Sequence, residues 1–155
     1  MKRLWRRLSN LRDNVRGNAM LEFALGSGVM ILIFTGTFQF GYTFYRYNTL
    51  ENAVNTGARY ASVKKYNSST SWPSADFLTA VQNVVVYGNA AGGTTPLAPG
   101  LTTDNVALTV TFTNSVPTMM TVAITGYTID SAVATTTLTS KPKVSYPFLG
   151  IYSPY

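Results

Sequence analysis

The chain carries one long hydrophobic segment near its start, and this segment predicts a membrane span. From Phe23 to Tyr45 the sequence has 23 residues without a charge, with Glu22 before them and Arg46 after them. As an α-helix rising about 1.5 Å per residue, the segment is roughly 35 Å long, enough to cross a hydrocarbon core of about 30 Å with some tilt. A buried core helix is the alternative, but a domain this small seldom needs a central helix without a charged face.

The helical period continues beyond the uncharged segment. Apolar and small residues recur at spacings of three and four, with polar residues between them, at Tyr47, Leu50, Val54, Gly57, Ala58 and Ala61. This pattern predicts one helix over residues 18–66, transmembrane at about 23–45. Because small side chains let another element approach closely, we expect the C-terminal sheet to pack against the stripe that contains Gly57, Ala58 and Ala61.

A second, shorter helix is predicted after a polar loop. Residues 67–73 are rich in turn formers and end with Pro73, which cannot continue a helix. Ser74 is a suitable N-cap, and Gly88 lies just past the expected end, so the helix should run from Ala75 to Tyr87.

From Asn105 onward the hydrophobic period changes from 3.6 to 2. Alternating apolar and polar residues predict strands at residues 105–112 and 120–125, joined by a turn near 114–117, with further strands at 132–139 and 143–148. A small antiparallel sheet of three or four strands with one apolar face is expected. The fold class is therefore α+β: a long N-terminal membrane helix, one additional short helix and a small C-terminal antiparallel sheet domain.

Positive charge is concentrated at the N-terminus. The net charge is +6, and residues 1–17 account for +5 of it. These residues include one acidic residue, Asp13, and six basic residues: Lys2, Arg3, Arg6, Arg7, Arg12 and Arg16. Basic residues directly before a span hold that end in the cytoplasm, which places the residues after the span outside. Nucleic-acid binding would need basic residues spread over a folded surface, so no nucleic-acid partner is expected.

The composition argues against catalysis. The chain has no cysteine and no histidine, which excludes metal sites built on thiolate or imidazole and any histidine-based catalytic triad. Asp76, Asp104 and Asp130 are far apart in the sequence and belong to no catalytic motif. We therefore expect a non-enzymatic protein with no metal and no cofactor.

A short motif stands at the start of the uncharged segment. Gly17 follows the basic leader, Glu22 is the fifth residue after it, and Phe23 comes next. This arrangement resembles the class III signal of type IV pilins and pseudopilins. A longer match, over about residues 16–61, resembles the TadE-like family of tight-adherence, or Flp-type, pilus systems; its most telling parts are residues 16–25, 40–45 and 50–61.

The resemblance implies how the chain is processed and assembled. A prepilin peptidase would cut between Gly17 and Asn18, which makes 1–17 a cleaved cytoplasmic leader. Glu22, beside Phe23, would then be neutralised by the new N-terminal amine of a neighbouring subunit and would set the register between subunits. Ala24 and Gly28 form a small-xxx-small pair suited to a helix contact. Many relatives carry a proline where this chain has Gly28.

The implied function is that of a pilin-like pseudopilin, a minor structural or assembly subunit of a tight-adherence type IVb pilus. Its expected location is the bacterial inner membrane, as a single-pass protein with a cytoplasmic N-terminus and an exported α+β domain at residues 67–155, periplasmic or extracellular, and incorporated in a surface pilus. Its expected partners are the membrane, the prepilin peptidase, other pilin and pseudopilin subunits and the pilus assembly machinery. Two alternatives remain: an uncleaved, membrane-anchored exported domain, and a pilus-tip adhesin that uses its aromatic C-terminal tail.

Overall fold

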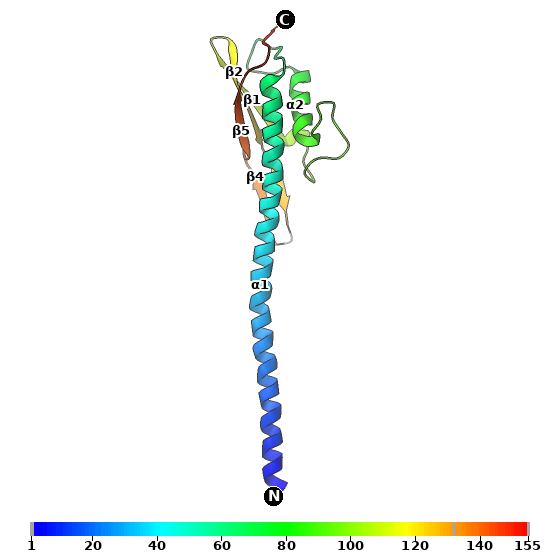
Figure 1. Ribbon diagram of the computed structural model, residues 1–155, viewed down its shortest axis with the longest axis vertical. Helices are drawn as coiled ribbons and strands as arrows, with labels where there is room; N and C mark the ends of the chain where they lie inside the picture. The colour runs from blue at the N-terminus through cyan, green and yellow to red at the C-terminus, as the bar shows by residue number, and fades with distance from the viewer. Residues whose placement is uncertain (1, 132, 155) are drawn as a thin grey trace. The chain divides into compact units, whose positions relative to one another are not determined.

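A computed structural model describes residues 2–131 and 133–154, with side chains from residue 17 onward. The side chains of the expected basic leader therefore lie outside the described residues. The elements confirm the α+β, pilin-like arrangement (Figure 1). In order they are α1 (Lys2–Val63), α2 (Ala75–Tyr87), the 3-10 turn η1 (Thr103–Asn105), β1 (Val106–Thr113), β2 (Val116–Ile124), β3 (Tyr127–Asp130), β4 (Thr135–Leu138) and β5 (Lys143–Pro147).

The chain divides into two compact units, Met1–Gly41 and Tyr42–Tyr155. Helix α1 belongs to both, because its residues up to Gly41 form the first unit and its remaining residues lie in the second. Among the described residues, one helix is long and apolar enough to cross a membrane, and it lies near the N-terminus over Gly17–Val63.

The main sheet of the second unit has the predicted period of two. Its strand order is β1-β2-β5, and both pairs are antiparallel. Val110 pairs with Met120, which in turn pairs with Tyr146, so the apolar side chains of the three strands share one face. The β1–β2 hairpin turns at Asn114 and Ser115, which both have positive φ (51° and 63°), as a two-residue hairpin turn with the twist of its strands requires.

A second, two-stranded sheet differs from the prediction. The expected single sheet of three or four strands is replaced by two sheets with five strands among the described residues, because β3 pairs with β4 instead of joining the main sheet. Strand β3 was not predicted. It has four residues, of which Tyr127 and Ile129 are buried, and such a short alternation carries little pattern. It follows Gly126 (φ 71°), which turns the chain out of β2.

Helix α2 has the predicted bounds and caps. The Phe77 N–H donates to the Ser74 Oγ at 3.3 Å, which satisfies a free amide of the first turn. At the other end the Gly88 N–H donates to the Val84 carbonyl at 2.9 Å, and Gly88 has the left-handed conformation (φ 74°) typical of a helix C-terminus.

The part of α1 in the second unit packs on both α2 and the sheet. A Cβ placed on Gly57 would overlap Cγ2 of Val85, so this glycine lets α2 approach α1 closely. On another side of α1, the Tyr146 hydroxyl of β5 donates to Oδ1 of Asn55 at 2.7 Å. The neighbour at Gly57 is thus α2, whereas we expected the sheet at this stripe. Ala58 and Ala61 on the same helix are fully buried.

Tyr66 connects four parts of the second unit. It lies just after α1, is fully buried, and its ring packs near the rings of Phe77 in α2, Phe112 in β1 and Tyr152 in the C-terminal tail. The Tyr66 N–H donates to the Ile151 carbonyl at 2.9 Å, and the Ser153 N–H donates to the Tyr66 carbonyl at 3.0 Å. These contacts attach the tail to the end of α1.

The close approach at Gly57 can be tested by filling it. Gly57→Ala should lower the free energy of unfolding by about 1–3 kcal/mol, because the added methyl overlaps Val85, whose branched side chain has little rotamer freedom in a helix. Urea unfolding of the full chain in detergent, followed by near-ultraviolet circular dichroism, measures the change. The double variant Gly57→Ala/Val85→Ala should lose less unfolding free energy than the sum of the losses in the two single variants.

Gly41→Ala is the control, since no heavy atom lies within 4 Å of its Cβ position. A Gly57→Ala protein as stable as the Gly41→Ala protein would contradict the proposed contact.

Tyr66 should make the second unit sensitive to alkaline pH. Burial raises the pKa of the Tyr66 hydroxyl above its ordinary value of 10.0. The folded state therefore holds this proton more tightly than the unfolded state, so the contribution to stability is complete below about pH 10 and is lost as the pH rises through the raised pKa. Tyr66→Phe should flatten the loss of stability above about pH 10, as measured by urea unfolding between about pH 8 and pH 11. Parallel curves for the two proteins would rule out this role of Tyr66.

Candidate functional site

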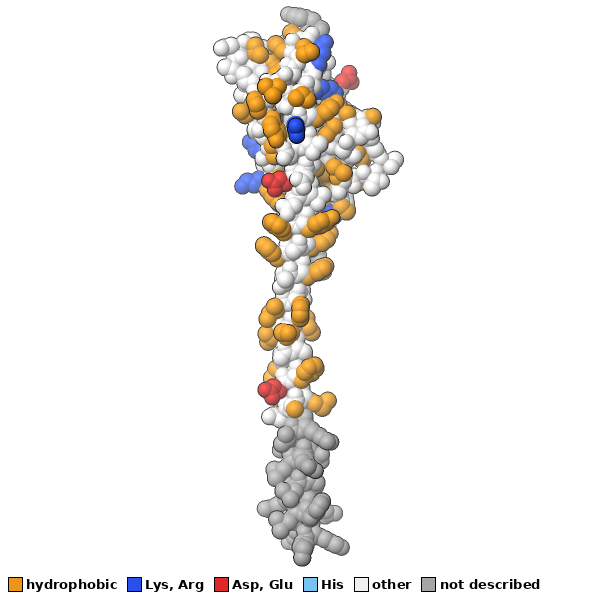
Figure 2. All heavy atoms as spheres, viewed as in Figure 1, with side chains coloured by type: hydrophobic (Ala, Val, Ile, Leu, Met, Phe, Trp, Pro, Cys, Tyr) orange, Lys and Arg blue, Asp and Glu red, His pale blue; other side chains and the backbone are white. Residues whose placement is uncertain are grey.

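The first candidate site is the segment of α1 from Gly17 to Gly41. Its large apolar side chains are exposed in the structure: Met20 is 76% exposed and Phe23 is 77% exposed. Figure 2 shows hydrophobic side chains along the visible face of this part of the helix. Such a surface is unfavourable in water at about 25 cal/mol per Å² of apolar area. The segment therefore favours a lipid or protein environment.

Two hydroxyl groups in this segment, those of Ser27 and Thr37, are satisfied within the helix. The Ser27 Oγ donates to the Ala24 carbonyl at 2.9 Å, and the Thr37 Oγ1 donates to the Ile33 carbonyl at 2.9 Å. Because these bonds need no water, the hydroxyls are compatible with a hydrocarbon environment. These two hydroxyls therefore do not prevent the segment from entering a membrane.

Glu22 is the one charged residue between Gly17 and Tyr45. Its side chain is exposed, and it makes no ion pair with any described residue. Exposed apolar side chains lie next to it in the sequence on both sides, at Leu21 and Phe23. If this surface becomes covered, an unpaired carboxylate there costs a few kcal/mol, so a cation from outside the described residues would be needed.

Small residues leave open space on the same segment. No heavy atom lies within 4 Å of a Cβ built on Gly17 or Gly28. Ala24 and Gly28 are four residues apart and therefore share one helix face, as the sequence indicates. A separate apolar groove of about 480 Å³ on this segment, which neither of these two residues lines, is formed by Phe23, Gly26, Ser27, Met30, Ile31 and Phe34.

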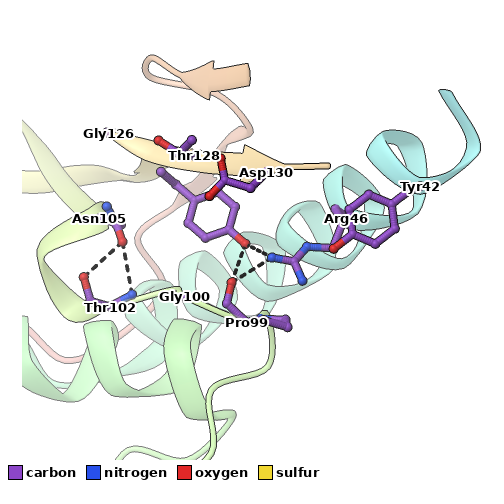
Figure 3. A pocket seen from close by; sticks show the side chains of 10 residues that line it. Tyr42, Arg46, Pro99, Gly100, Thr102, Asn105, Gly126, Thr128 and Asp130 are labelled. Atoms are coloured by element: carbon purple, nitrogen blue, oxygen red, sulfur yellow. Dashed lines mark hydrogen bonds between the residues drawn. The ribbon is translucent and has the colours of Figure 1, made fainter. Parts of the chain in front are cut away.

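A second candidate site surrounds Arg46, in the other unit. This side chain is only 8% exposed. Its Nη2 donates to the Pro99 carbonyl at 2.7 Å and to the Tyr127 hydroxyl, which itself donates to the same carbonyl at 2.8 Å (Figure 3). The guanidinium carbon lies 5.7 Å from the ring centre of Tyr42 and 5.9 Å from that of Tyr127, within cation–π range.

Sequence reasoning treated Arg46 as a charge that merely ends the span and did not predict its burial. The available signal was an isolated arginine between Tyr42, Tyr45 and Tyr47, because tyrosine rings can cover a guanidinium and their hydroxyls can accept from it. The residues that bond to it most directly, Pro99 and Tyr127, are more than 50 positions away in the chain.

The predicted site residues fall into two groups. Those of the cleavage and assembly motif lie on the exposed part of α1 in the first unit: Gly17, Asn18, Glu22, Phe23, Ala24 and Gly28. Those of the small-residue stripe lie in the core of the second unit: Gly57, Ala58 and Ala61. The described residues include no group of three or more acidic side chains placed to hold a metal ion.

A comparison with protein families matches residues 17–59 to the family described as TadE-like protein. The match begins at the expected cleavage glycine and ends within the buried stripe of α1. Neither the comparison with curated proteins nor that with solved structures gives a match.

Proposed function

We propose that this chain, whose residues 17–59 form a TadE-like domain, is a pseudopilin that serves as a minor structural or assembly subunit of a tight-adherence type IVb pilus. The TadE-like family is generally a non-enzymatic component of pili, and it implies association with the pilus machinery. The observation that carries the proposal is the coincidence of the family match, which begins at Gly17, with an exposed apolar stretch of α1 that is uncharged from Phe23 to Tyr45.

In this proposal the helix inserts in the inner membrane at about residues 23–45, and residues 67–155 are exported. The one membrane-capable helix near the N-terminus is consistent with a membrane or pilus location. The basic residues before Gly17 favour a cytoplasmic N-terminus. The presence of a folded unit after the span, with its own core of α1, α2 and the sheets, favours a minor subunit over a short major pilin.

Processing would remove residues 1–17. Gly17 lies inside α1, so a peptidase has to unwind the helix locally before the backbone can enter its cleft. Glycine weakens a helix by about 1 kcal/mol relative to alanine, and no described atom outside its own helix backbone lies within 4 Å of the Cβ position of Gly17. Both properties favour cleavage between Gly17 and Asn18 by a prepilin peptidase.

Assembly would pair Glu22 with the new amine of Asn18 on a neighbouring subunit. No described residue of the same chain neutralises Glu22. Because an apolar helix surface can pack at many relative heights, a single buried ion pair selects the one stagger that satisfies both charges. Phe23, Ala24 and Gly28 lie on the surface that would contact the neighbour.

The two alternatives differ from this proposal in testable ways. An uncleaved membrane anchor keeps the span and the outer unit but would retain Met1. A tip adhesin would use the aromatic C-terminal tail, yet Tyr152 of that tail packs against Tyr66 and Phe112 of its own unit. No contact in the described residues favours the adhesin over the pseudopilin.

The ion-pair proposal predicts a specific assembly defect. Glu22→Val should insert in the membrane normally but reduce the amount of this subunit in sheared pili by about tenfold or more, because the amine of the neighbour is then left without a carboxylate. Immunoblots of membrane and sheared-pilus fractions, with immunogold labelling of the pili, measure the two steps separately. Glu51→Gln, at an exposed position on the same helix, is the matched control. Normal incorporation of the Glu22→Val subunit in sheared pili would contradict the proposed ion pair between Glu22 and the amine of Asn18.

The processing proposal predicts that peptidase cleavage depends on Gly17. Gly17→Val should leave the chain at its unprocessed length, because a branched side chain crowds the extended backbone in the peptidase cleft and cannot be accommodated as glycine is. N-terminal sequencing of the membrane-extracted protein detects the product, which should begin at Asn18 in the wild type. Gly36→Val is the control, since Gly36 also has open space around it but lies away from the cut. A product that begins at Asn18 from Gly17→Val would show that this glycine is dispensable, and a wild-type chain that begins at Met1 would favour the uncleaved anchor.

A further inference from the structure

The second unit contains a pocket of about 550 Å³ beside Arg46. It is lined by residues of α1, of the loop before η1, and of β3, including Tyr42, Thr102, Thr128 and Asp130 (Figure 3). All of its lining residues belong to the unit Tyr42–Tyr155. This volume is in the range of pockets that hold small ligands.

The charge of Arg46 is not neutralised within the described residues. Both hydrogen bonds of its guanidinium come from Nη2, and both acceptors, the Pro99 carbonyl and the Tyr127 hydroxyl, are neutral. The Nε is buried and has no hydrogen-bond partner among the described residues. Arg46 also makes no ion pair there, although Asp130 lines the same pocket. A guanidinium has five N–H donors, so an anion in the pocket would find donors that the protein does not use.

The position of the pocket along the chain indicates where such an anion would come from. Tyr42 lies in the last turn of the expected span, and Arg46 is the first charged residue after it. A residue that directly follows a span lies at the level of the lipid headgroups, where tyrosines also gather. Arginine binds phosphate through charge-assisted hydrogen bonds, and its guanidinium is more weakly hydrated than an ammonium group.

We propose that the Arg46 pocket binds a phosphate group, supplied by the headgroup of a phospholipid in the outer leaflet of the membrane. Arg46 provides the positive charge and the free N–H donors. Asp130 opposes binding from the wall of the pocket and limits the affinity. The bound headgroup would attach the second unit to the membrane surface next to the end of the span. The lipid source rests on the proposed membrane insertion, whereas the phosphate chemistry of the pocket does not.

The test uses the full-length protein in two arms. In the lipid arm, protein reconstituted in phosphatidylglycerol vesicles is extracted in mild detergent, and native mass spectrometry counts the phospholipid that each chain retains. In the phosphate arm, lipid-free protein in detergent is titrated with inorganic phosphate, and binding is followed by phosphorus NMR.

Arg46→Gln should reduce the retained phospholipid and the affinity for inorganic phosphate by about tenfold, because it removes charge-assisted hydrogen bonds. Asp130→Asn should increase both. Arg59→Gln, an exposed arginine on the same helix, should change neither.

Each outcome decides the proposal. Retained phosphatidylglycerol that depends on Arg46 supports the headgroup as the ligand, and binding of inorganic phosphate alone supports the phosphate site but overturns the lipid source. Absence of binding in both arms, or an equal loss in Arg59→Gln, overturns the site. If Arg46→Gln fails to fold, Asp130→Asn decides, because unchanged binding in that variant contradicts the proposal. Vesicle flotation of the wild type tests insertion separately, so a failed membrane function is distinguishable from an empty pocket.

Discussion

The constraint on which this structure depends is the change in surroundings along α1. Up to Gly41 the large apolar side chains of the helix are exposed, whereas beyond Tyr42 its stripe of Leu50, Val54 and Ala58 is fully buried. The second part is stabilised by its own chain, because α2 and the β1-β2-β5 sheet cover it. The first part has no such cover among the described residues. An apolar surface of this kind favours a lipid or protein environment over water, which is consistent with a membrane or pilus location.

The contacts that hold the second unit together come from within that unit. Tyr66 brings the end of α1, α2, β1 and the C-terminal tail together through ring contacts and two backbone hydrogen bonds. Gly57 lets the two helices approach closely enough to pack without a gap. The chain has no cysteine that could supply a disulfide, so the second unit relies on packing of this kind.

Local patterns predicted the elements that depend on neighbours in the sequence. The uncharged segment, the capped helix Ala75–Tyr87 and the β1–β2 hairpin all follow from periodicity, caps and turn residues that lie within a few positions of each other. Tertiary contacts were harder to predict. The packing of Val85 against Gly57 and the burial of Arg46 by Tyr127 each join residues far apart in the chain. The pairing of β3 with β4 joins neighbouring segments, but each strand has only four residues and so carries little pattern. In each case the residue types allowed several partners, and only the fold selects one.

Glu22 and Arg46, the two charged residues that flank the expected span, lie in opposite environments. The difference indicates which of the two charges depends more on another molecule. Arg46 is covered by its own unit, with neutral acceptors and aromatic faces that offset much of the cost of burying its charge. Its burial is therefore supported from within its own unit, although its Nε has no hydrogen-bond partner among the described residues. Glu22 has no such cover, since its neighbours along the helix are exposed and apolar. In water or at a membrane surface the carboxylate is hydrated, but once other helices pack on this segment the hydration is lost and only an added cation restores the balance. Under the proposed function, Glu22 is thus the position at which insertion alone would not suffice and a neighbouring subunit would have to contribute a cation.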